Sequence, residues 1–432
     1  MTLAYAIPRE WWRPEPAAAS AERAPASQDA PASRLAYAAL LAFTLILLLA
    51  PQHRFPLLAT LRIAFLTGVL AIVAHVWNRW ALGLPLARPA RETRLVFLLL
   101  VWTLVGLPFS YWPGGSVELL LDLYLKALVV FWLIGNVVDT LPRLRGMAWT
   151  LTLLSIPLAA GGISNYLSDV TVSTHDRILG YDSGLTRNPN DLALMLNLIL
   201  PLSVSLLLSS QRLRERALLL FTLALQLIAV VLTFSRAGFL TLALLLLVYG
   251  FRLRRTRSWR FVAAGALLVA LAVAFLPSGY LERILTLRAI EADATGSAKE
   301  RYSGNVAALD HVAEHPLLGA GLGMNILVLN ETVGAKWRAV HNTYLEYAVD
   351  LGVPGLLLFL LLLWTCFRSA RAARRSGGAA LFPLAQGIEI SLIGFALAAI
   401  FHPAAYRFYF YYVGGLALAA RTVAERETEA AA

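Results

Sequence analysis

One histidine, next to a long apolar run, has the clearest chemical potential in this sequence. His341 begins the segment His341-Asn-Thr-Tyr-Leu-Glu-Tyr-Ala-Val-Asp-Leu-Gly-Val-Pro-Gly355. A neutral imidazole can accept a proton from a hydroxyl group near neutral pH. His341 is therefore a candidate general base, while a structural role is the ordinary alternative for a lone histidine.

Arg236 lies in a short connection, Thr233-Phe-Ser-Arg-Ala-Gly238, between two apolar runs. The turn is so short that the guanidinium must lie at the edge of the apolar layer, where an unbalanced cation is costly. A guanidinium can hold phosphate oxygens with two parallel hydrogen bonds, which suits a lipid-linked phosphate or pyrophosphate. The alternative is a side chain that extends to the lipid headgroups.

A third candidate segment, Arg187-Asn-Pro-Asn-Asp191, precedes another apolar run. Asn188 is expected to cap this helix, with Pro189 at its first position. Arg187 would then stand beside a helix N-terminus, whose free N–H groups also favour anions. A plain helix cap with a solvated arginine is the alternative.

The remaining polar residues give weaker signals. Arg62 lies nearly two turns inside an apolar run, and His402 and Arg407 flank the last outer turn. Asp122 and Lys126 have the i,i+4 spacing of a helical ion pair. A group of four tyrosines is expected to form an aromatic belt at the membrane interface, namely Tyr406, Tyr409, Tyr411 and Tyr412.

Several motifs that would indicate other chemistry are missing from the sequence. It contains no phosphate-binding Gly-x-x-x-x-Gly-Lys-Ser/Thr, no His-Glu-x-x-His and no Asp-x-Asp. We therefore expect no cofactor, no metal-dependent mechanism and no nucleotide-driven transport. The single cysteine, Cys366, excludes an internal disulfide framework.

The composition is that of a polytopic membrane protein. The 432 residues are 59% hydrophobic and only 15% charged, with a net charge of +11. Apolar runs long enough to cross a bilayer predict about twelve helices and an all-α fold. The predicted spans are Leu35–Ala50, Pro56–Trp77, Leu95–Phe109, Val117–Val138, Met147–Tyr166, Asp191–Ser209, Ala217–Phe234, Ala237–Phe251, Phe261–Pro277, His341–Phe367, Leu384–Phe401 and Phe408–Ala420.

The distribution of basic residues predicts the orientation of these spans. With twelve spans both termini lie on one side, and 24 of the 37 Lys and Arg residues fall in the loops and tails of that side. The positive-inside rule makes it the cytoplasmic side. The excess positive charge thus serves orientation, and we expect no nucleic-acid partner.

Five regions follow from this topology. Residues 1–34 form a disordered cytoplasmic tail, residues 35–277 carry nine spans, residues 341–420 carry three, and residues 421–432 form a second tail. Between them, residues 278–340 form an outer loop far longer than an ordinary connection. Helices are expected at Tyr280–Glu291 and Ala298–His315, with a sharp break at Gly319-Ala-Gly-Leu-Gly323. We also expect Gly352 to Gly355 to break the long run that follows His341.

The motifs resemble those of a known family. The segments around Arg187, Arg236 and His341, with Arg301-Tyr-Ser-Gly-Asn-Val-Ala-Ala-Leu-Asp310 and His315-Pro-Leu-Leu-Gly-Ala-Gly-Leu-Gly323, are similar to those of O-antigen ligases. These enzymes belong to a superfamily that includes O-antigen polymerases and pilin oligosaccharyltransferases. The resemblance covers roughly residues 180 to 355.

The resemblance implies a C-type glycosyltransferase architecture in the bacterial inner membrane, with the active site facing the periplasm. It implies transfer of polysaccharide from undecaprenyl pyrophosphate to a sugar of lipid A–core, with inversion and without metal or ATP. His341 matches the catalytic histidine, and Arg236 and Arg301 match arginines of the same motifs. Further candidates for substrate binding are Arg187, Arg288, Asn188, Asn342, Arg62 and Arg407.

Three alternatives remain at this point. An O-antigen polymerase often has Gly at position +11 after an outer-loop arginine, and none of the outer arginines here has one. The absence modestly favours a ligase. A protein O-oligosaccharyltransferase of the same superfamily is the second alternative. A lipid-sugar or solute transporter is the third, although transporters usually place polar residues near the membrane midplane, and here they gather at one face.

Overall fold

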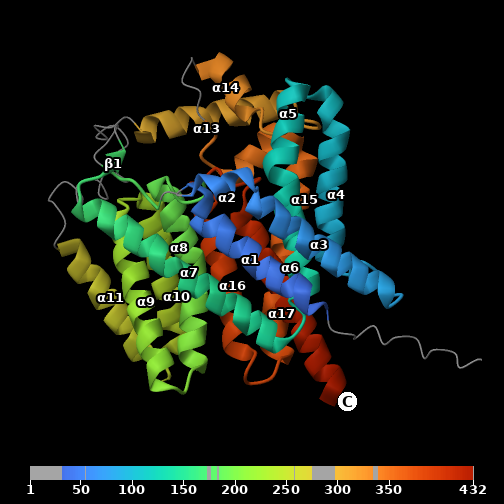
Figure 1. Cartoon of the computed structure of the whole chain (residues 1–432). Helices are drawn as coiled ribbons and strands as arrows, with labels where there is room; N and C mark the ends of the chain where they lie inside the picture. The colour runs from blue at the N-terminus through green and yellow to red at the C-terminus, as the bar shows by residue number, and fades with distance from the viewer. Residues whose placement is uncertain are drawn as a thin grey trace, which may run out of the picture.

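The computed structural model describes residues 32–53, 55–172, 177–181, 184–256, 258–274, 297–333 and 339–431. These residues form an almost entirely helical bundle (Figure 1). A single two-residue ladder joins β1 (Thr171–Val172) to β2 (Arg177–Ile178) in antiparallel pairing. The all-α prediction is confirmed.

Every predicted span overlaps helical structure. The first half of the bundle contains α1 (Arg34–Leu49), α2 (Pro56–Thr60), α3 (Ile63–Ala81), α4 (Arg91–Gly106), α5 (Pro113–Leu119), α6 (Leu125–Val137), α7 (Leu141–Leu167) and α8 (Pro189–Ser209). The second half contains α9 (Leu213–Leu232), α10 (Arg236–Leu253), α11 (Trp259–Ala274), α15 (Thr343–Ser376), α16 (Phe382–Ala398) and α17 (Phe408–Ala431).

Length and composition agree with a multi-pass membrane protein. Seven of the described helices are long and apolar enough to cross a membrane, namely α3, α4 with its short extension to Phe109, α7, α8, α9, α10 and α15. Helices α1, α11 and α16 are apolar but shorter. The predicted count of twelve needs these shorter helices, the interrupted run from α5 to α6, and α17.

Between α11 and α15 the described residues include two helices of the predicted outer loop, α13 (Ser297–Glu314) and α14 (Asn325–Val333). Helix α13 matches the predicted helix at Ala298–His315. The predicted helix at Tyr280–Glu291, and nearly all of the tail at residues 1–34, lie outside the described residues. Helices α13 and α14 lie at the end of the bundle opposite the C-terminus (Figure 1).

The expected breaks in the chain are confirmed. Gly352 interrupts α15 with φ +68°, and Gly319, Gly321 and Gly323 also have positive φ. A Cβ on Gly352 would stand 2.1 Å from the carbonyl oxygen of Leu317. Glycine is thus required there both for its conformation and for close contact with the loop.

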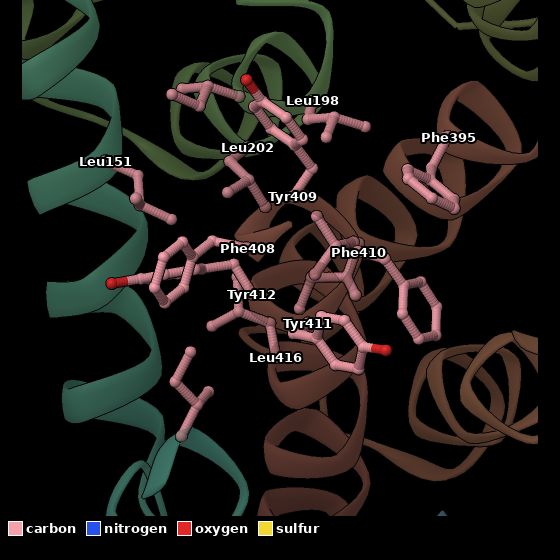
Figure 2. Close-up of a cluster of buried hydrophobic side chains, with 14 of the residues drawn as sticks. Leu151, Leu198, Leu202, Phe395, Phe408, Tyr409, Phe410, Tyr411, Tyr412 and Leu416 are labelled. Carbon is pink, nitrogen blue, oxygen red and sulfur yellow. The ribbon is translucent and has the colours of Figure 1, made fainter. Parts of the chain in front are cut away.

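The predicted aromatic belt is wrong. Tyr406, Tyr409, Tyr411 and Tyr412 are at most 8% exposed. Tyr409, Tyr411 and Tyr412 lie at the start of α17, inside the bundle among side chains of α7, α8 and α16 (Figure 2), and Tyr406 lies in the turn just before that helix. Their hydroxyls have protein partners, for instance Tyr411 with Tyr347 at 2.7 Å and Tyr412 with Thr44 at 3.0 Å. Because these partners are internal, the phenols face the core instead of the lipid headgroups.

Candidate functional site

Two of the predicted motifs meet where α8 and α10 begin. Ser235 caps α10 by accepting a hydrogen bond from the Gly238 N–H at 3.1 Å, and its hydroxyl donates to the Asn190 side chain at 2.7 Å. Asn197, farther along α8, donates to the Gly238 carbonyl at 2.9 Å. The N-termini of both helices, with Arg187 and Arg236 beside them, therefore lie side by side.

The start of α8 forms as the sequence predicts. Asn188 caps the helix by accepting from the Asn190 N–H at 2.9 Å, and Pro189 occupies the first helical position. Arg187 and Asn188 are exposed, and Arg236 is partly buried. Two helix N-termini with two arginines make this end of the bundle favourable for an anion.

Asp191, in the first turn of α8, connects this pair to the turn between α16 and α17. Its carboxylate lies 2.6 Å from His402 Nε2 and 3.5 Å from Arg407 Nη1. The two residues predicted to flank the last outer turn thus converge on one acid. Arg407 is fixed to the start of α8.

The same turn also holds the start of α15. The Thr343 N–H donates to the Ala399 carbonyl at 2.8 Å, and its hydroxyl donates to the His402 carbonyl at 2.6 Å. Asn342 caps α15 by accepting from the N–H groups of Tyr344 and Leu345. A continuous set of contacts therefore joins the N-termini of α8, α10 and α15, which brings the Arg187, Arg236 and His341 motifs together.

His341 has a defined orientation in this arrangement. Its Nδ1 lies 2.9 Å from the Ala339 carbonyl oxygen, and the ring is partly buried. A carbonyl oxygen can only accept, so Nδ1 must carry the proton. In the neutral ring Nε2 then holds the lone pair, as proton abstraction requires.

Two buried acids on α15 were not predicted. Glu346 and Asp350 are one helical turn apart, and each is less than 9% exposed. Glu346 accepts a hydrogen bond from the Ala405 N–H at 3.0 Å. The signal that could have identified them is their i,i+4 spacing inside an apolar run, where acids are rare.

Asp350 fixes the glycine-rich turn of the loop against α15. Its carboxylate accepts from the N–H groups of Gly323 (3.0 Å) and Asn325 (2.7 Å), from the Asn325 side chain and from the Tyr406 hydroxyl (3.0 Å). Backbone bonds reinforce this attachment, including Ala320 N to Val349 O at 2.7 Å. Asp350 thereby holds this turn of the loop against α15, about two helical turns beyond His341.

The other predicted residues fall into three cases. Arg301 lies on α13, which packs against α14 and α15, whereas Arg288 lies outside the described residues. Arg62 is exposed where α2 meets α3, with φ +47°. Within the described part of the chain, no hydrogen bond or ion pair joins Arg62 to the helix starts.

Two further side-chain predictions have clear outcomes. Asp122 and Lys126 form the predicted ion pair at 3.7 Å. On α13, His311 is partly buried and stacks on the exposed His315, with ring centroids 4.6 Å apart. Burial lowers the pKa of His311, and the neighbouring His315 lowers it further.

Among the described residues, no group of three or more His, Cys, Asp or Glu side chains is close enough to hold a metal ion. The side chains that converge at the helix starts are arginine, asparagine, histidine and a few paired acids. This set suits recognition of an anionic group by N–H donors beside a proton acceptor.

Comparison with protein families supports the resemblance of these motifs to those of O-antigen ligases. Residues 221–360 match a family model described as O-antigen ligase. The matched part runs from α9 through the first half of α15 and includes Arg236, Arg301 and His341. No curated protein matches the chain.

Proposed function

We propose, because residues 221–360 match the O-antigen ligase family, that the protein transfers a polysaccharide from undecaprenyl pyrophosphate to a sugar hydroxyl of lipid A–core. The match supports a glycosyltransferase-like function in the O-antigen ligase and polymerase superfamily, acting on lipid-linked polysaccharide. What we propose beyond this superfamily-level function is the ligase reaction itself, with lipid A–core as the acceptor.

The observation that carries the proposal is the meeting of three helix starts. Contacts through Asn190, Ser235, Asp191, His402 and Thr343 join the N-termini of α8, α10 and α15. This arrangement puts arginines and a correctly protonated imidazole at one end of a membrane bundle. A reaction between a lipid-linked pyrophosphate and a hydroxyl can use both groups, as cationic stabiliser and as general base.

In the proposed mechanism, Nε2 of His341 takes the proton from the acceptor hydroxyl as its oxygen attacks the anomeric carbon. The bond between that carbon and the pyrophosphate oxygen breaks, and the electron pair leaves with undecaprenyl pyrophosphate. Attack from the opposite face inverts the anomeric carbon. General-base assistance of this kind contributes about 10²–10⁴-fold in rate.

Arginines stabilise the charge that grows on the leaving pyrophosphate. Arg236 and Arg301 are the proposed direct partners, and Arg187, Arg288 and Arg407 extend the positive field toward the donor. Asn188, Asn342 and Arg62 are proposed to contact substrate at the same face. Fixed cationic donors stabilise developing negative charge without needing to reorganise.

The orientation is part of the proposal. In it both termini lie in the cytoplasm, and the helix starts, with the loop at residues 278–340, face the periplasm. The basic side chains at the opposite end favour this arrangement by the positive-inside rule. The lipid tail of the donor would enter between helices while the loop receives the acceptor.

The test is transfer by the purified protein, supplied with polysaccharide on undecaprenyl pyrophosphate and with lipid A–core. A ligase yields lipid A–core that carries the whole polymer, and it works in the presence of EDTA. Lengthening of the lipid-linked chain, with no product on lipid A–core, would instead indicate a polymerase. Loss of transfer in EDTA would overturn the metal-free mechanism.

A further inference from the structure

A concave region, which we call the basic pocket, lies at the end of the bundle opposite the helix starts. Its volume is about 360 Å³, and it lies where α4 begins and the C-terminal part of α17 passes. Six arginines line it, namely Arg79, Arg88, Arg91, Arg94, Arg421 and Arg426. Among the described residues, the acids that line it are Glu425 and Glu429.

The arginines of the basic pocket differ in how they are held. Arg88 and Arg426 bind the buried carboxylate of Asp139 at 3.3 and 3.1 Å, and Arg421 pairs with Glu425 at 2.7 Å. Arg91 and Arg94 are exposed, and neither forms an ion pair with an acid among the described residues. The pocket therefore keeps a net positive charge after its internal pairs are formed.

Helix α4 adds a second feature that favours an anion. Its N-cap is Ala90, which lines the basic pocket, and no side chain caps the first turn. The N–H groups of that turn and the positive end of the helix dipole lie beside the pocket. Glu92, in the same turn, is buried and accepts a hydrogen bond from Ser369.

An apolar groove of about 660 Å³ adjoins the basic pocket between α4 and α6. The groove and the pocket share Arg88, Pro89, Ala90 and Arg94. The rest of the groove is mostly apolar and includes Val96, Phe97, Leu128, Val129, Phe131 and Trp132. The Thr93 hydroxyl, also in the groove wall, has no hydrogen-bond partner within the described residues.

We propose that the basic pocket and the apolar groove together bind one anionic glycerophospholipid. Its phosphate headgroup occupies the pocket against Arg91, Arg94 and the start of α4, and an acyl chain lies in the groove along α4 and α6. Charge complementarity and the direct continuity of the two cavities select this occupant over a soluble phosphate. In the proposed orientation the site faces the anionic cytoplasmic leaflet.

The site is separate from the transfer reaction. The chain's N-terminal half and the end of α17 form it, and the family match at residues 221–360 includes none of its residues. The result of the transfer assay therefore does not decide whether the lipid binds here. Lipid binding here likewise does not decide whether the protein is a ligase.

The experiment measures thermal unfolding of the detergent-purified full chain with added dioleoyl phosphatidylglycerol, dioleoyl phosphatidylcholine or glycerol phosphate. Phosphatidylglycerol is expected to raise the unfolding temperature at concentrations where the other two do not. Equal stabilisation by phosphatidylcholine would indicate general detergent replacement, and equal stabilisation by glycerol phosphate would indicate an anion site without a chain groove. Either result overturns the proposal.

A matched pair of variants locates the effect. Arg91→Gln with Arg94→Gln is expected to weaken the apparent affinity for phosphatidylglycerol by roughly 10–30-fold. Each arginine near an anionic headgroup increases the affinity roughly 3–5-fold, and the double variant removes two. The control, Arg255→Gln with Arg371→Gln, removes two exposed arginines that do not line the pocket. Equal affinity in both double variants would refute the location.

Native mass spectrometry of the unmodified protein gives a result that does not depend on any variant folding. One retained phosphatidylglycerol per chain, selected from an equal mixture with phosphatidylcholine, is the expected outcome. Retention of the two lipids in equal amounts would count against the site.

Discussion

The two ends of the helical bundle both bury acidic side chains, but they neutralise them in different ways. At the end with the helix starts, Asp350 is held by backbone N–H groups, an asparagine amide and a tyrosine hydroxyl. At the opposite end, Glu389 of α16 binds Arg252 and Arg374 at 2.9 and 2.6 Å. Asp139 likewise binds three arginines.

The two ways of holding a buried acid have different consequences for the arginines nearby. Where guanidinium groups bind an internal carboxylate, their charge is used within the protein and stabilises the packing of helices. Where neutral donors hold the acid, nearby arginines are not needed for that purpose. At the end with the helix starts Asp191 still binds Arg407, but Asp350 is held without an arginine, so variants at the two ends should differ in what they impair.

The largest effect is expected from His341→Ala. Removal of the proposed general base should slow transfer by about 10²–10⁴-fold, the usual contribution of such a group. The donor lipid should still bind, because the arginines remain. The measurement is the rate of transfer to lipid A–core at saturating donor, with donor affinity determined separately.

The matched control for His341→Ala is His315→Ala, which removes an exposed histidine of the same loop region. Its transfer rate should stay within about twofold of the unmodified protein, an energetic change below about 0.5 kcal/mol. A His341→Ala protein that kept more than a tenth of the rate would exclude the general-base role.

Asp350→Asn is expected to have the next largest effect. The new amide would place its NH2 group against the backbone N–H of either Gly323 or Asn325, because these two donors bond to different carboxylate oxygens. Each buried group left without a partner costs about 1–3 kcal/mol. The glycine-rich turn should detach from α15, with a drop in transfer of roughly 10–100-fold if about 1.4–2.7 kcal/mol of transition-state stabilisation is lost.

Limited proteolysis, followed by identification of the cut sites, would show the detached turn directly. Tyr406→Phe is the graded control, because it removes one donor to Asp350 and leaves the backbone donors in place. It should cause a smaller loss. If Asp350→Asn neither exposed the turn nor slowed transfer, Asp350 would have no positioning role.

Much of the fold was predictable because apolar length and glycine position act locally. Each predicted span overlaps helical structure, and the breaks at Gly319–Gly323 and Gly352 fall where predicted. The tyrosines of α17 were misjudged because composition cannot distinguish a phenol at a membrane interface from one that hydrogen-bonds inside a bundle. That distinction depends on partners such as Tyr347 and Thr44, which are distant in sequence.

The site was predictable only in part for the same reason. Local motifs identified Arg187, Arg236 and His341 as candidates, and Asn188 caps its helix as expected. The importance of Asp191 and Asp350 came from contacts across the bundle, with His402 and with the loop at Gly323. A search for Asp-x-Asp pairs passed over Glu346 and Asp350, whose partners lie elsewhere in the sequence.

Arg236→Lys, at the end with the helix starts, should have a moderate effect on the KM for the donor. Lysine keeps the charge but loses the planar pair of donors that suits a phosphate group. Loss of one hydrogen bond, about 1–1.4 kcal/mol, should raise the KM for the donor roughly 5–10-fold. Arg212→Lys, at a side chain that is 84% exposed before α9, serves as the control and should leave the KM unchanged. An equal KM in both variants would indicate that Arg236 is only an interfacial anchor.

Glu389→Gln should have the smallest effect on the transfer rate but should clearly lower the stability of the protein. This variant therefore tests the difference between the two ends most directly. The amide cannot balance the charges of Arg252 and Arg374, so the unfolding free energy should fall by about 1–3 kcal/mol. The rate per folded molecule should stay within about twofold, because the arginines at the helix starts are unaffected. Thermal unfolding and transfer are measured on the same preparation. A rate that fell as far as that of Asp350→Asn would mean that the two ends are coupled, since Arg252 and Arg374 belong to α10 and α15, the helices that begin at Arg236 and just after His341.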